Sequence, residues 1–475
     1  MATPAWRELF GGGHGGRAVA LAAGVTLHAI NIFVAATIMP SVVADIGGLA
    51  WYAWNTTLFT VGSIVGAAGS AELLARQGVR SAYRMGTAAF AAGTLVCALA
   101  PAMPVLLAGR TLQGLGGGVL FALSYAVIRL VLPQPLWPRA IALVSGTWGV
   151  AALSGPFVGG IFAQIGHWRL AFWTVIAATA AFALLCARVL PPATAAPPGG
   201  SSGMRFPVRR LALLAGAALA ISGASVVPSL AVNAAGVAVA LALLAGMVRL
   251  ERRATVRLLP ADAFRPRSPL GAIYLTMALI ISGTNCIVFV PYLLQTVHGL
   301  SPLAAGYLTV LQALGWTVGA LISAGLGEGR ARKAVVFGPM VTMLGLAGLA
   351  VRMPIPGDGT LLHVASIAAI LPLVGLGIGI GWPHLLTRVM TVAAEGERGL
   401  ASSSISTVQL VASAFATALA GVIVNLAGLT VPGGRVGAAN AALWLFGCFA
   451  VSSLLAVLSA ASLARRMRRL DEDRT

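Results

Sequence analysis

The sequence predicts an all-helical polytopic membrane protein, and three observations support this fold class. Only 9% of the 475 residues are charged and 58% are hydrophobic, whereas soluble domains carry about 25% charged residues. The apolar residues form runs of about twenty, the length at which a helix crosses about 30 Å of hydrocarbon. The basic residues concentrate on alternate connections between these runs.

Fourteen apolar runs are expected to form transmembrane helices. In chain order they cover residues 18–38, 53–72, 83–101, 105–128, 140–163, 170–190, 210–226, 229–249, 270–294, 304–325, 333–351, 361–386, 401–426 and 440–463. The first run is too long for a signal-peptide core and no small-residue cleavage site follows it, so we expect it to remain as the first helix.

The basic residues set the orientation. With residue 1 inside the cell, 27 of the 31 basic residues lie on inner connections, and only Arg169, Arg352 and Arg435 lie on outer ones. Basic loops resist translocation, so both termini are expected in the cytoplasm. The same rule requires residues 210–250 to cross twice, with a hinge at residues 225–228, because one crossing would place the later basic loops outside.

Composition limits the partners. The net charge is +19, but the basic residues are spread thinly and lack interleaved aromatic residues, which disfavours nucleic acid and favours anionic lipids of the inner leaflet. Thirty arginines against one lysine, with abundant alanine and glycine, are typical of a GC-rich bacterial genome, so we expect a bacterial cytoplasmic membrane. The four cysteines lack the spacing of a zinc or redox site, and neither a metal nor a cofactor is expected.

Two breaks divide the chain. Residues 191–207 are rich in Pro, Gly, Ala and Ser, as flexible linkers are, and residues 249–267 are charged. We expect a six-helix half over residues 1–190, cytoplasmic linkers and a two-helix insert over residues 191–267, and a second six-helix half with a basic tail over residues 268–475. Many transporters are duplicated in this way and bind substrate between the halves, near the bilayer midplane.

Glycines concentrate in the fourth and fifth predicted helices, where Gly114 and Gly118, and then Gly155 and Gly159, recur at a spacing of four. Small residues at this spacing let helices approach closely in lipid. Pro156 removes one backbone hydrogen bond, so the sequence predicts a kinked and tightly packed fifth helix.

These stretches resemble motifs of the major facilitator superfamily, specifically its fourteen-helix drug:proton antiporter branch. Residues 109–116, GRTLQGLG, are similar to the fourth-helix pattern R-x-x-Q-G-x-G of the family. Residues 146–160, which contain SGPFVGG, are similar to the fifth-helix motif that the family associates with export. The resemblance implies the major facilitator fold, two six-helix halves plus two inserted helices, and proton-driven efflux of drugs.

Two positions depart from the family patterns. The first-helix pattern L-D-x-T-I-V-N-V-A-L-P maps onto residues 30–40 with Asn31 at the acidic position. This departure places in question proton coupling through the usual carboxylate of the family.

The second departure lies in the loop pattern G-x-L-A-D-R-x-G-R-R, which maps onto residues 71–80. Arg76, Gly78 and Arg80 are preserved, but the acid is replaced by alanine. Glu72 lies one turn earlier on the same helix face and is expected to replace that acid as the partner of the arginines.

Ionisable residues within membrane spans are costly and by default mark function. Arg110 in the fourth helix and His28 in the first are the candidates, with His384 as a weaker third near the inner end of its helix. His28 shares a helix face with Asn31, and an ordinary histidine exchanges protons near neutral pH. Its alternative role is a neutral histidine bonded to a neighbouring helix.

Further polar and aromatic side chains in the spans suit an adaptable, mostly apolar pocket. They are Gln113, Asn285, Tyr292, Gln312, Trp316, Trp382 and Gln409. For each of them, hydrogen bonding between helices is an equally good interpretation.

The sequence therefore predicts a secondary transporter that exports small amphipathic molecules by alternating access, coupled to protons. One alternative is an uncoupled uniporter or importer, and another is a non-transporting lipid-handling or sensor protein, because fold does not fix function. An enzyme is not expected. Residues 199–203 match G-x-S-x-G but lie in the linker, and the sequence contains no P-loop pattern for ATP.

Overall fold

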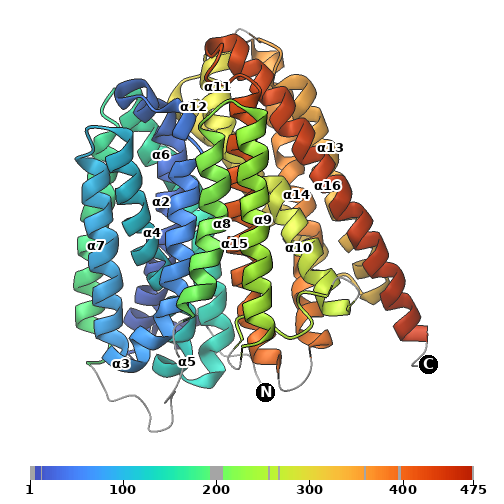
Figure 1. Ribbon diagram of the computed structural model, residues 1–475. Helices are drawn as coiled ribbons and strands as arrows, with labels where there is room; N and C mark the ends of the chain where they lie inside the picture. The colour runs from blue at the N-terminus through green and yellow to red at the C-terminus, as the bar shows by residue number, and fades with distance from the viewer. Residues whose placement is uncertain are drawn as a thin grey trace. The chain divides into compact units, whose positions relative to one another are not determined.

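The computed structural model describes residues 6–11, 13–192, 207–254, 257–265, 268–357, 360–393 and 397–472, and every regular element in these ranges is helical (Figure 1). The α-helices are α1 (Trp6–Phe10), α2 (Gly15–Ile46), α3 (Trp54–Ala98), α4 (Met103–Ala126), α5 (Ile128–Val131), α6 (Trp137–Gln164), α7 (Arg169–Val189), α8 (Val208–Ser225), α9 (Leu230–Arg252), α10 (Pro269–Asn285), α11 (Val290–His298), α12 (Pro302–Ser323), α13 (Glu328–Arg352), α14 (Leu361–Val392), α15 (Arg398–Leu426) and α16 (Gly434–Glu472). Short 3-10 helices are η1 (Leu49–Trp51), η2 (Gln134–Leu136) and η3 (Cys286–Phe289).

Thirteen helices in the described ranges are long and apolar enough to cross a membrane. One of them, Leu49–Ala98, has 50 residues, about 75 Å at 1.5 Å per residue, which suffices for two crossings. Gly78 divides it, because its φ of 72° and ψ of 174° are not helical and glycine adopts a positive φ without strain. A fourteen-helix chain requires such a division, and the number of crossings itself stays a prediction.

The helices form two compact units. The first comprises residues 1–48 and 58–211. In it α2 packs against α4, α6 and α7, and the core includes Leu21, Phe90 and Leu120, each fully buried. The centre of α2 is therefore enclosed by other helices of its own unit, which is where His28 lies.

The second unit comprises residues 49–57 and 212–475. In it α14 packs against both α12 and α13, and α10 packs against α15 and α16. The single run predicted at residues 270–294 is interrupted, because η3 separates α10 from α11. A 3-10 stretch within a helical span often marks a hinge.

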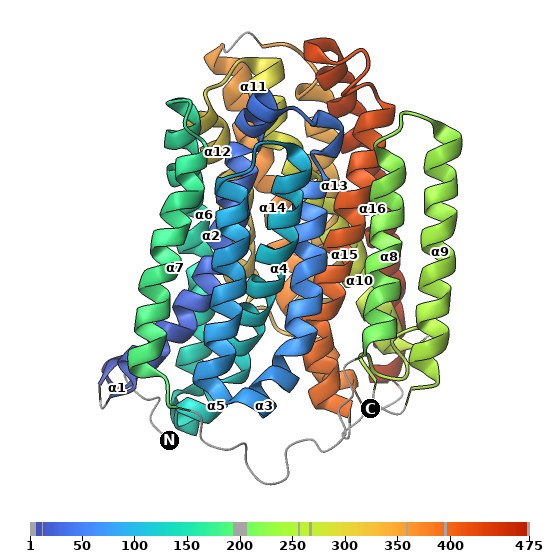
Figure 2. The same ribbon diagram turned by 60° about the vertical axis from the view of Figure 1, so that its left-hand side comes forward.

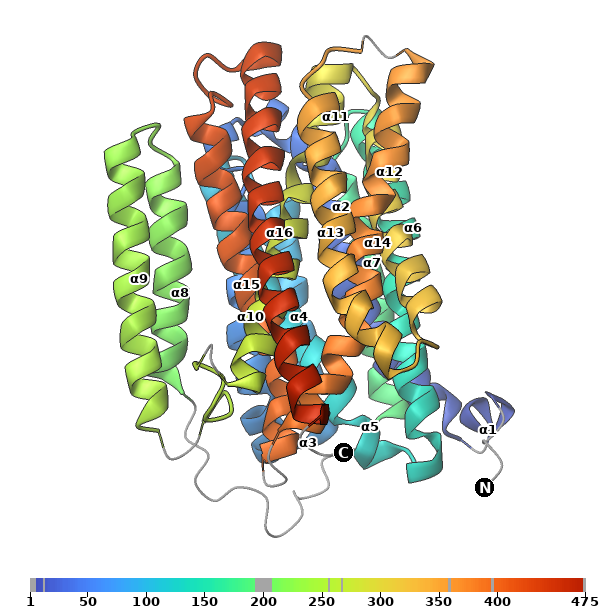
Figure 3. The ribbon, with the colours of Figure 1, turned by 90° about the vertical axis from the view of Figure 1, so that its right-hand side faces the viewer.

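The inserted pair, α8 and α9, belongs to the second unit and its helices lie side by side (Figures 2 and 3). Small apolar side chains pack it against α15, among them Ala217 and Ile221 of α8 and Ala418 of α15. At the end of α15, Asn425 Nδ2 donates to Ser225 O of α8 at 2.8 Å. As the charge pattern requires, residues 210–250 form two helices rather than one.

Candidate substrate and proton site

Arg110 lies at the start of a directed chain of hydrogen bonds inside the first unit. Its side chain on α4 is 1% exposed, and Nη1 donates to Gln113 Oε1 at 2.5 Å. Gln113 Nε2 donates to Thr94 Oγ1 of α3 at 2.8 Å, and the Thr94 hydroxyl donates to Phe90 O at 2.7 Å. These bonds fix the amide of Gln113 so that its oxygen faces the guanidinium, which partly compensates the cost of burying a charge.

Phe59 of α3 contacts the guanidinium group as well. Arg110 Cζ lies 4.3 Å from the centroid of the Phe59 ring, a cation–π distance. A desolvated pair of this kind contributes about 2 kcal/mol. Gln113 thus gives the buried charge a polar partner, and Phe59 adds an aromatic partner that the sequence did not indicate.

His28 of α2 contacts the same phenylalanine. The imidazole is 3% exposed, and its centroid lies 5.2 Å from those of Phe59 and Phe121 and 6.4 Å from that of Trp148. Nδ1 of His28 has no hydrogen-bond partner among the described residues. A titratable ring surrounded by three aromatic rings, with one nitrogen unpaired, can accept a proton or a polar ligand group.

Asn31 lies one turn further along α2 and is 0% exposed. Neither Oδ1 nor Nδ2 has a hydrogen-bond partner within the described ranges. A buried amide left unpaired costs about 1–3 kcal/mol, and most buried polar groups are paired. His28 and Asn31 thus offer unpaired polar atoms at neighbouring turns of one helix.

Glycines bring the surrounding helices close to these side chains. A Cβ atom at Gly117 of α4 would lie 2.9 Å from His28 Nδ1, and one at Gly114 would lie 2.1 Å from the backbone oxygen of Phe59. Gly114, within the R-x-x-Q-G-x-G pattern, therefore admits the backbone of α3 on one side of α4, and Gly117, directly after the pattern, admits the imidazole on another.

The glycines of α6 set the position of α2. A Cβ at Gly155 would lie 2.4 Å from Cβ of Phe33, and one at Gly159 would lie 3.0 Å from Val34 O. The tight packing predicted for the fifth helix is confirmed, and its partner is the helix that carries His28 and Asn31. Pro156 lies inside α6 and is buried; a kink at this residue stays a prediction.

Residues 71–80 of α3, which map onto the family's loop pattern, contain the expected ion pair. Glu72 Oε1 lies 2.5 Å from Arg76 Nη2. Arg80 does not share this acid, because its Nε and Nη2 donate to Leu190 O at 2.9 Å and 2.5 Å, beyond the end of α7. Glu72 is therefore the partner of one arginine rather than two, and Gly78 supplies the positive-φ break between them.

The remaining predicted residues lie in the second unit. Asn285 Nδ2 donates to Ile281 O at 2.7 Å and to Ser413 Oγ of α15 at 3.3 Å, so it connects α10 with α15. Tyr292 is buried, and Trp316 and Trp382 lie edge to face with centroids 6.1 Å apart.

The last three predicted polar groups are partly buried. Gln312 lies on α12, Gln409 on α15 and His384 on α14. His384 Nε2 has no hydrogen-bond partner among the described residues. The sequence identified these polar and aromatic residues as lying within predicted spans. Which of them contact one another is known only from the structure.

Sequence reasoning missed Phe59, Phe121 and Thr94, which complete the surroundings of His28, Arg110 and Gln113. A phenylalanine or threonine in an apolar run carries no signal that separates a site residue from a core residue. Within the described ranges no group of three or more His, Cys, Asp and Glu side chains is arranged to hold a metal ion.

The described residues combine helices long and apolar enough to cross a membrane with a buried arginine–glutamine pair and glycine-mediated helix packing. A family model described as "Major Facilitator Superfamily" matches residues 21–417, so the chain belongs to that superfamily and is a transporter rather than an enzyme.

Relatives of known description support this assignment. The chain is 43% identical over 474 residues to a "Probable multidrug-efflux transporter" of Mycobacterium tuberculosis, covering 98% of each chain. It is 27% identical over 419 residues to the "Tetracenomycin C resistance and export protein" of Streptomyces glaucescens, covering 85% of this chain and 75% of the other.

Solved structures show the same fold. A D-xylose–proton symporter has a TM-score of 0.65 at 14% identity, covering 94% of this chain and 96% of the other. A bacterial homologue of the human lysosomal transporter Spinster has a TM-score of 0.66 at 14% identity, covering 96% and 97%. The all-helical major facilitator fold predicted from the sequence is confirmed.

Proposed function

We propose that this transporter exports small amphipathic molecules by alternating access and that protons drive the export through His28. The observation that carries the proposal is the contact of one buried ring, Phe59, with both His28 and the Arg110 guanidinium. A titratable group and a permanent cation thus lie in one aromatic environment. No carboxylate is required for a proton to change the charge at this place.

The arrangement gives a physical route to coupling. A proton on His28 adds a positive charge near Arg110, and in an environment of low dielectric such a pair repels strongly. The charged imidazole is favoured when the site is open to the acidic outer solution, and release follows when the site faces the cytoplasm. Alternating access exposes the site to each pH in turn.

The same charges bear on the substrate. Arg110 disfavours a second cation, whereas Phe59, Phe121 and Trp148 offer aromatic faces and Asn31 offers an unpaired amide. Such a lining suits neutral, amphipathic or anionic compounds. Export as the direction is supported by two relatives, one described as a probable multidrug-efflux transporter and matched over 98% of both chains, the other described as an export protein and matched over 75% of its length.

We further propose that the protein resides in the bacterial cytoplasmic membrane with both termini in the cytoplasm. The support is the distribution of arginines, which concentrates 27 of 31 basic residues on one side. Alternating access requires the halves expected at residues 1–190 and 268–475 to move relative to each other, and we expect the insert at residues 191–267 to accompany them.

An uncoupled uniporter or importer is the second candidate function. It is favoured by Asn31, an uncharged amide at the position where the family pattern has an acid. In this case His28 is a neutral packing residue, and flux follows only the gradient of the substrate.

Flux in proteoliposomes tests the proposal. The purified protein is reconstituted, a fluorescent amphipathic substrate is supplied on one side, and a pH gradient is imposed or omitted. An antiporter moves substrate against its gradient only when the pH gradient is present. Equal flux with and without the pH gradient identifies a uniporter, and the absence of flux identifies a sensor or lipid-handling protein.

A further inference from the structure

A cavity lies in the second unit, at the end of α9 and the connection that follows it. Its volume is about 180 Å³, and its lining includes three arginines, Arg252, Arg257 and Arg265, with apolar atoms from Leu259, Pro260 and Phe264. The arginines come from the last turn of α9 and from the connection to α10. The cavity thus combines a concentration of guanidinium groups with an apolar wall.

The carboxylate that lines this cavity is already engaged. Glu251 is 2% exposed, and its Oε1 accepts hydrogen bonds from the backbone N–H groups of Leu258 and, at 3.0 Å, Leu259. These bonds fold the connection back onto α9. Glu251 therefore shapes the cavity, and its one negative charge faces the positive charges of three lining arginines.

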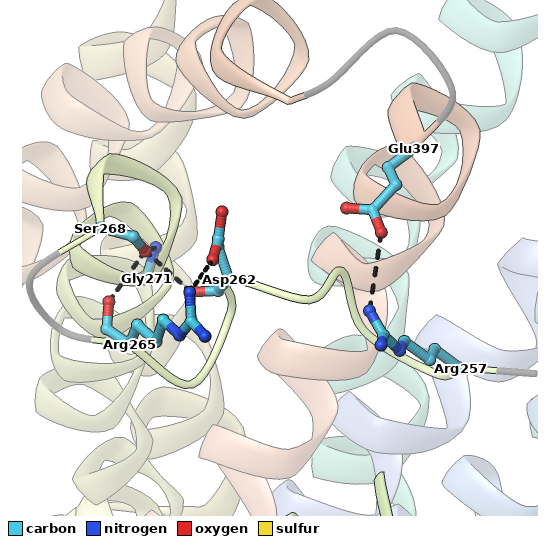
Figure 4. A network of polar contacts seen from close by, with 6 residues as sticks. All are labelled: Arg257, Asp262, Arg265, Ser268, Gly271 and Glu397. Atoms are coloured by element: carbon cyan, nitrogen blue, oxygen red, sulfur yellow. Dashed lines mark hydrogen bonds and ion pairs between the residues drawn. The ribbon is translucent and has the colours of Figure 1, made fainter. Parts of the chain in front are cut away.

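Figure 4 shows how the arginines of the connection are oriented. Arg265 Nη1 donates to Asp262 Oδ1 at 3.2 Å. Arg257 Nη1 forms an ion pair with Glu397 Oε1 at 3.9 Å, a separation too long for a hydrogen bond. For an anion of suitable shape, the donors of Arg257 are therefore more accessible than those of Arg265, and Arg252 is exposed at the end of its helix.

The exposed face of α9 indicates where the anion comes from. Leu241 is 62% exposed and lies about three turns before Arg252 on the same side of α9, and such a side chain on a membrane helix contacts lipid tails. A phospholipid lying along this face has its headgroup at the level of the helix end, where Arg252 lies. The planar fork of arginine matches phosphate oxygens in two hydrogen bonds.

We propose that this cavity binds the phosphate-bearing headgroup of an anionic phospholipid. Arg252 and Arg257 bind the phosphate, and Leu259, Pro260 and Phe264 contact the adjoining apolar part of the lipid. Because the lining contains apolar side chains as well as arginines, it suits a lipid headgroup with its adjoining apolar part better than free phosphate. The proposal does not depend on the substrate or on proton coupling, and it places the lipid at the connection between the inserted pair and α10.

Lipid binding to the purified full-length protein tests the proposal. Thermal unfolding in a neutral detergent is followed while phosphatidylglycerol, phosphatidylcholine or inorganic phosphate is added, because a ligand of the folded state raises Tm with its concentration. We expect saturable stabilisation by phosphatidylglycerol alone. The double variant Arg252→Gln/Arg257→Gln should bind it about thirtyfold more weakly, since each arginine near an anionic surface contributes about 1 kcal/mol.

The matched control is Arg188→Gln/Arg209→Gln, which removes the same charge from two exposed arginines outside the cavity. It should retain the affinity of the parent protein. The single variant Arg252→Gln should bind phosphatidylglycerol about fivefold more weakly. Because this position is exposed, the single variant keeps the test informative if the double variant misfolds.

Three results would overturn the proposal. Equal loss of affinity for phosphatidylglycerol in the double variant and in the control would show that the lipid is attracted by the overall positive charge and not by this cavity. Equal stabilisation by inorganic phosphate would show a site for a soluble anion. Indifference of the parent protein to the lipid headgroup would show that no such site exists.

Discussion

Replacing Gly117 by alanine is the most specific perturbation of His28 that leaves the imidazole itself in place. The added Cβ would lie 2.9 Å from His28 Nδ1, and 3.4 Å and 3.5 Å from two ring carbons of Phe90. Ordinary contacts lie at about 3.5–4.0 Å, so the imidazole must move by about half an ångström or more. The movement must take Nδ1 away from Gly117.

Gly117→Ala should change the free energy of unfolding only modestly but should have a larger effect on proton coupling. Inserting a methyl group into a packed interior costs about 1–3 kcal/mol, and alanine improves on glycine within a helix by about 1 kcal/mol. The net loss of stability is therefore about 0–2 kcal/mol. Displacing the imidazole also reduces the fraction of molecules in which His28 keeps the position that it has in the parent protein. Each 1.4 kcal/mol of destabilisation of that position lowers the fraction by about tenfold.

The assay is substrate flux in proteoliposomes at a series of pH gradients, with thermal stability measured in parallel. Gly117→Ala should fold, bind substrate and lose most of the acceleration by the pH gradient. Gly447→Ala on α16 is the control, because a Cβ there meets no atom within 4 Å, and its flux should match that of the parent. A Gly117→Ala protein whose flux follows the pH gradient as the parent does would refute the role assigned to the imidazole.

Three further predictions concern the charge, the substrate and the topology. Arg110→Ala should abolish transport while the protein still inserts, because Gln113 loses its partner and the site its cation; flux near the parent level would show that the charge is only tolerated. Competition assays should rank neutral and anionic amphipathic compounds above divalent quaternary drugs, whose strong export would contradict the effect of Arg110. Single cysteines replacing Arg205, which lies outside the described residues, and Arg257 should resist an impermeant thiol reagent added to intact cells, whereas labelling of either would exclude two crossings by residues 210–250.

Hydropathy and charge made the helical architecture predictable, because membrane helices satisfy their backbone polar groups internally and are visible as apolar runs. The separation of the second and third predicted runs was predictable from the charged stretch around Gly78, where the backbone of α3 is not helical. The break at η3 was missed. It depends on backbone geometry within an apolar run, which hydropathy does not report.

The candidate site was predictable only in part. Arg110 and His28 were identifiable because charged and titratable groups are rare in membrane spans. Their common contact, Phe59, was not identifiable, since its role arises from the close approach of α3 to α4 at Gly114. The partner of Glu72 followed from helical spacing, whereas the bond of Arg80 to Leu190 required knowledge of where α7 ends.

The central claim is that the imidazole of His28 carries the proton, and the response of flux to a pH gradient in His28→Gln tests it most directly. Glutamine keeps a polar group at this buried position but does not titrate. His167→Gln, at an exposed histidine, is the matched control and should behave as the parent. We expect His28→Gln to bind substrate and to carry it down its own gradient while losing acceleration by the pH gradient. Transport by His28→Gln against a substrate gradient, at the rate and pH dependence of the parent, would contradict the account.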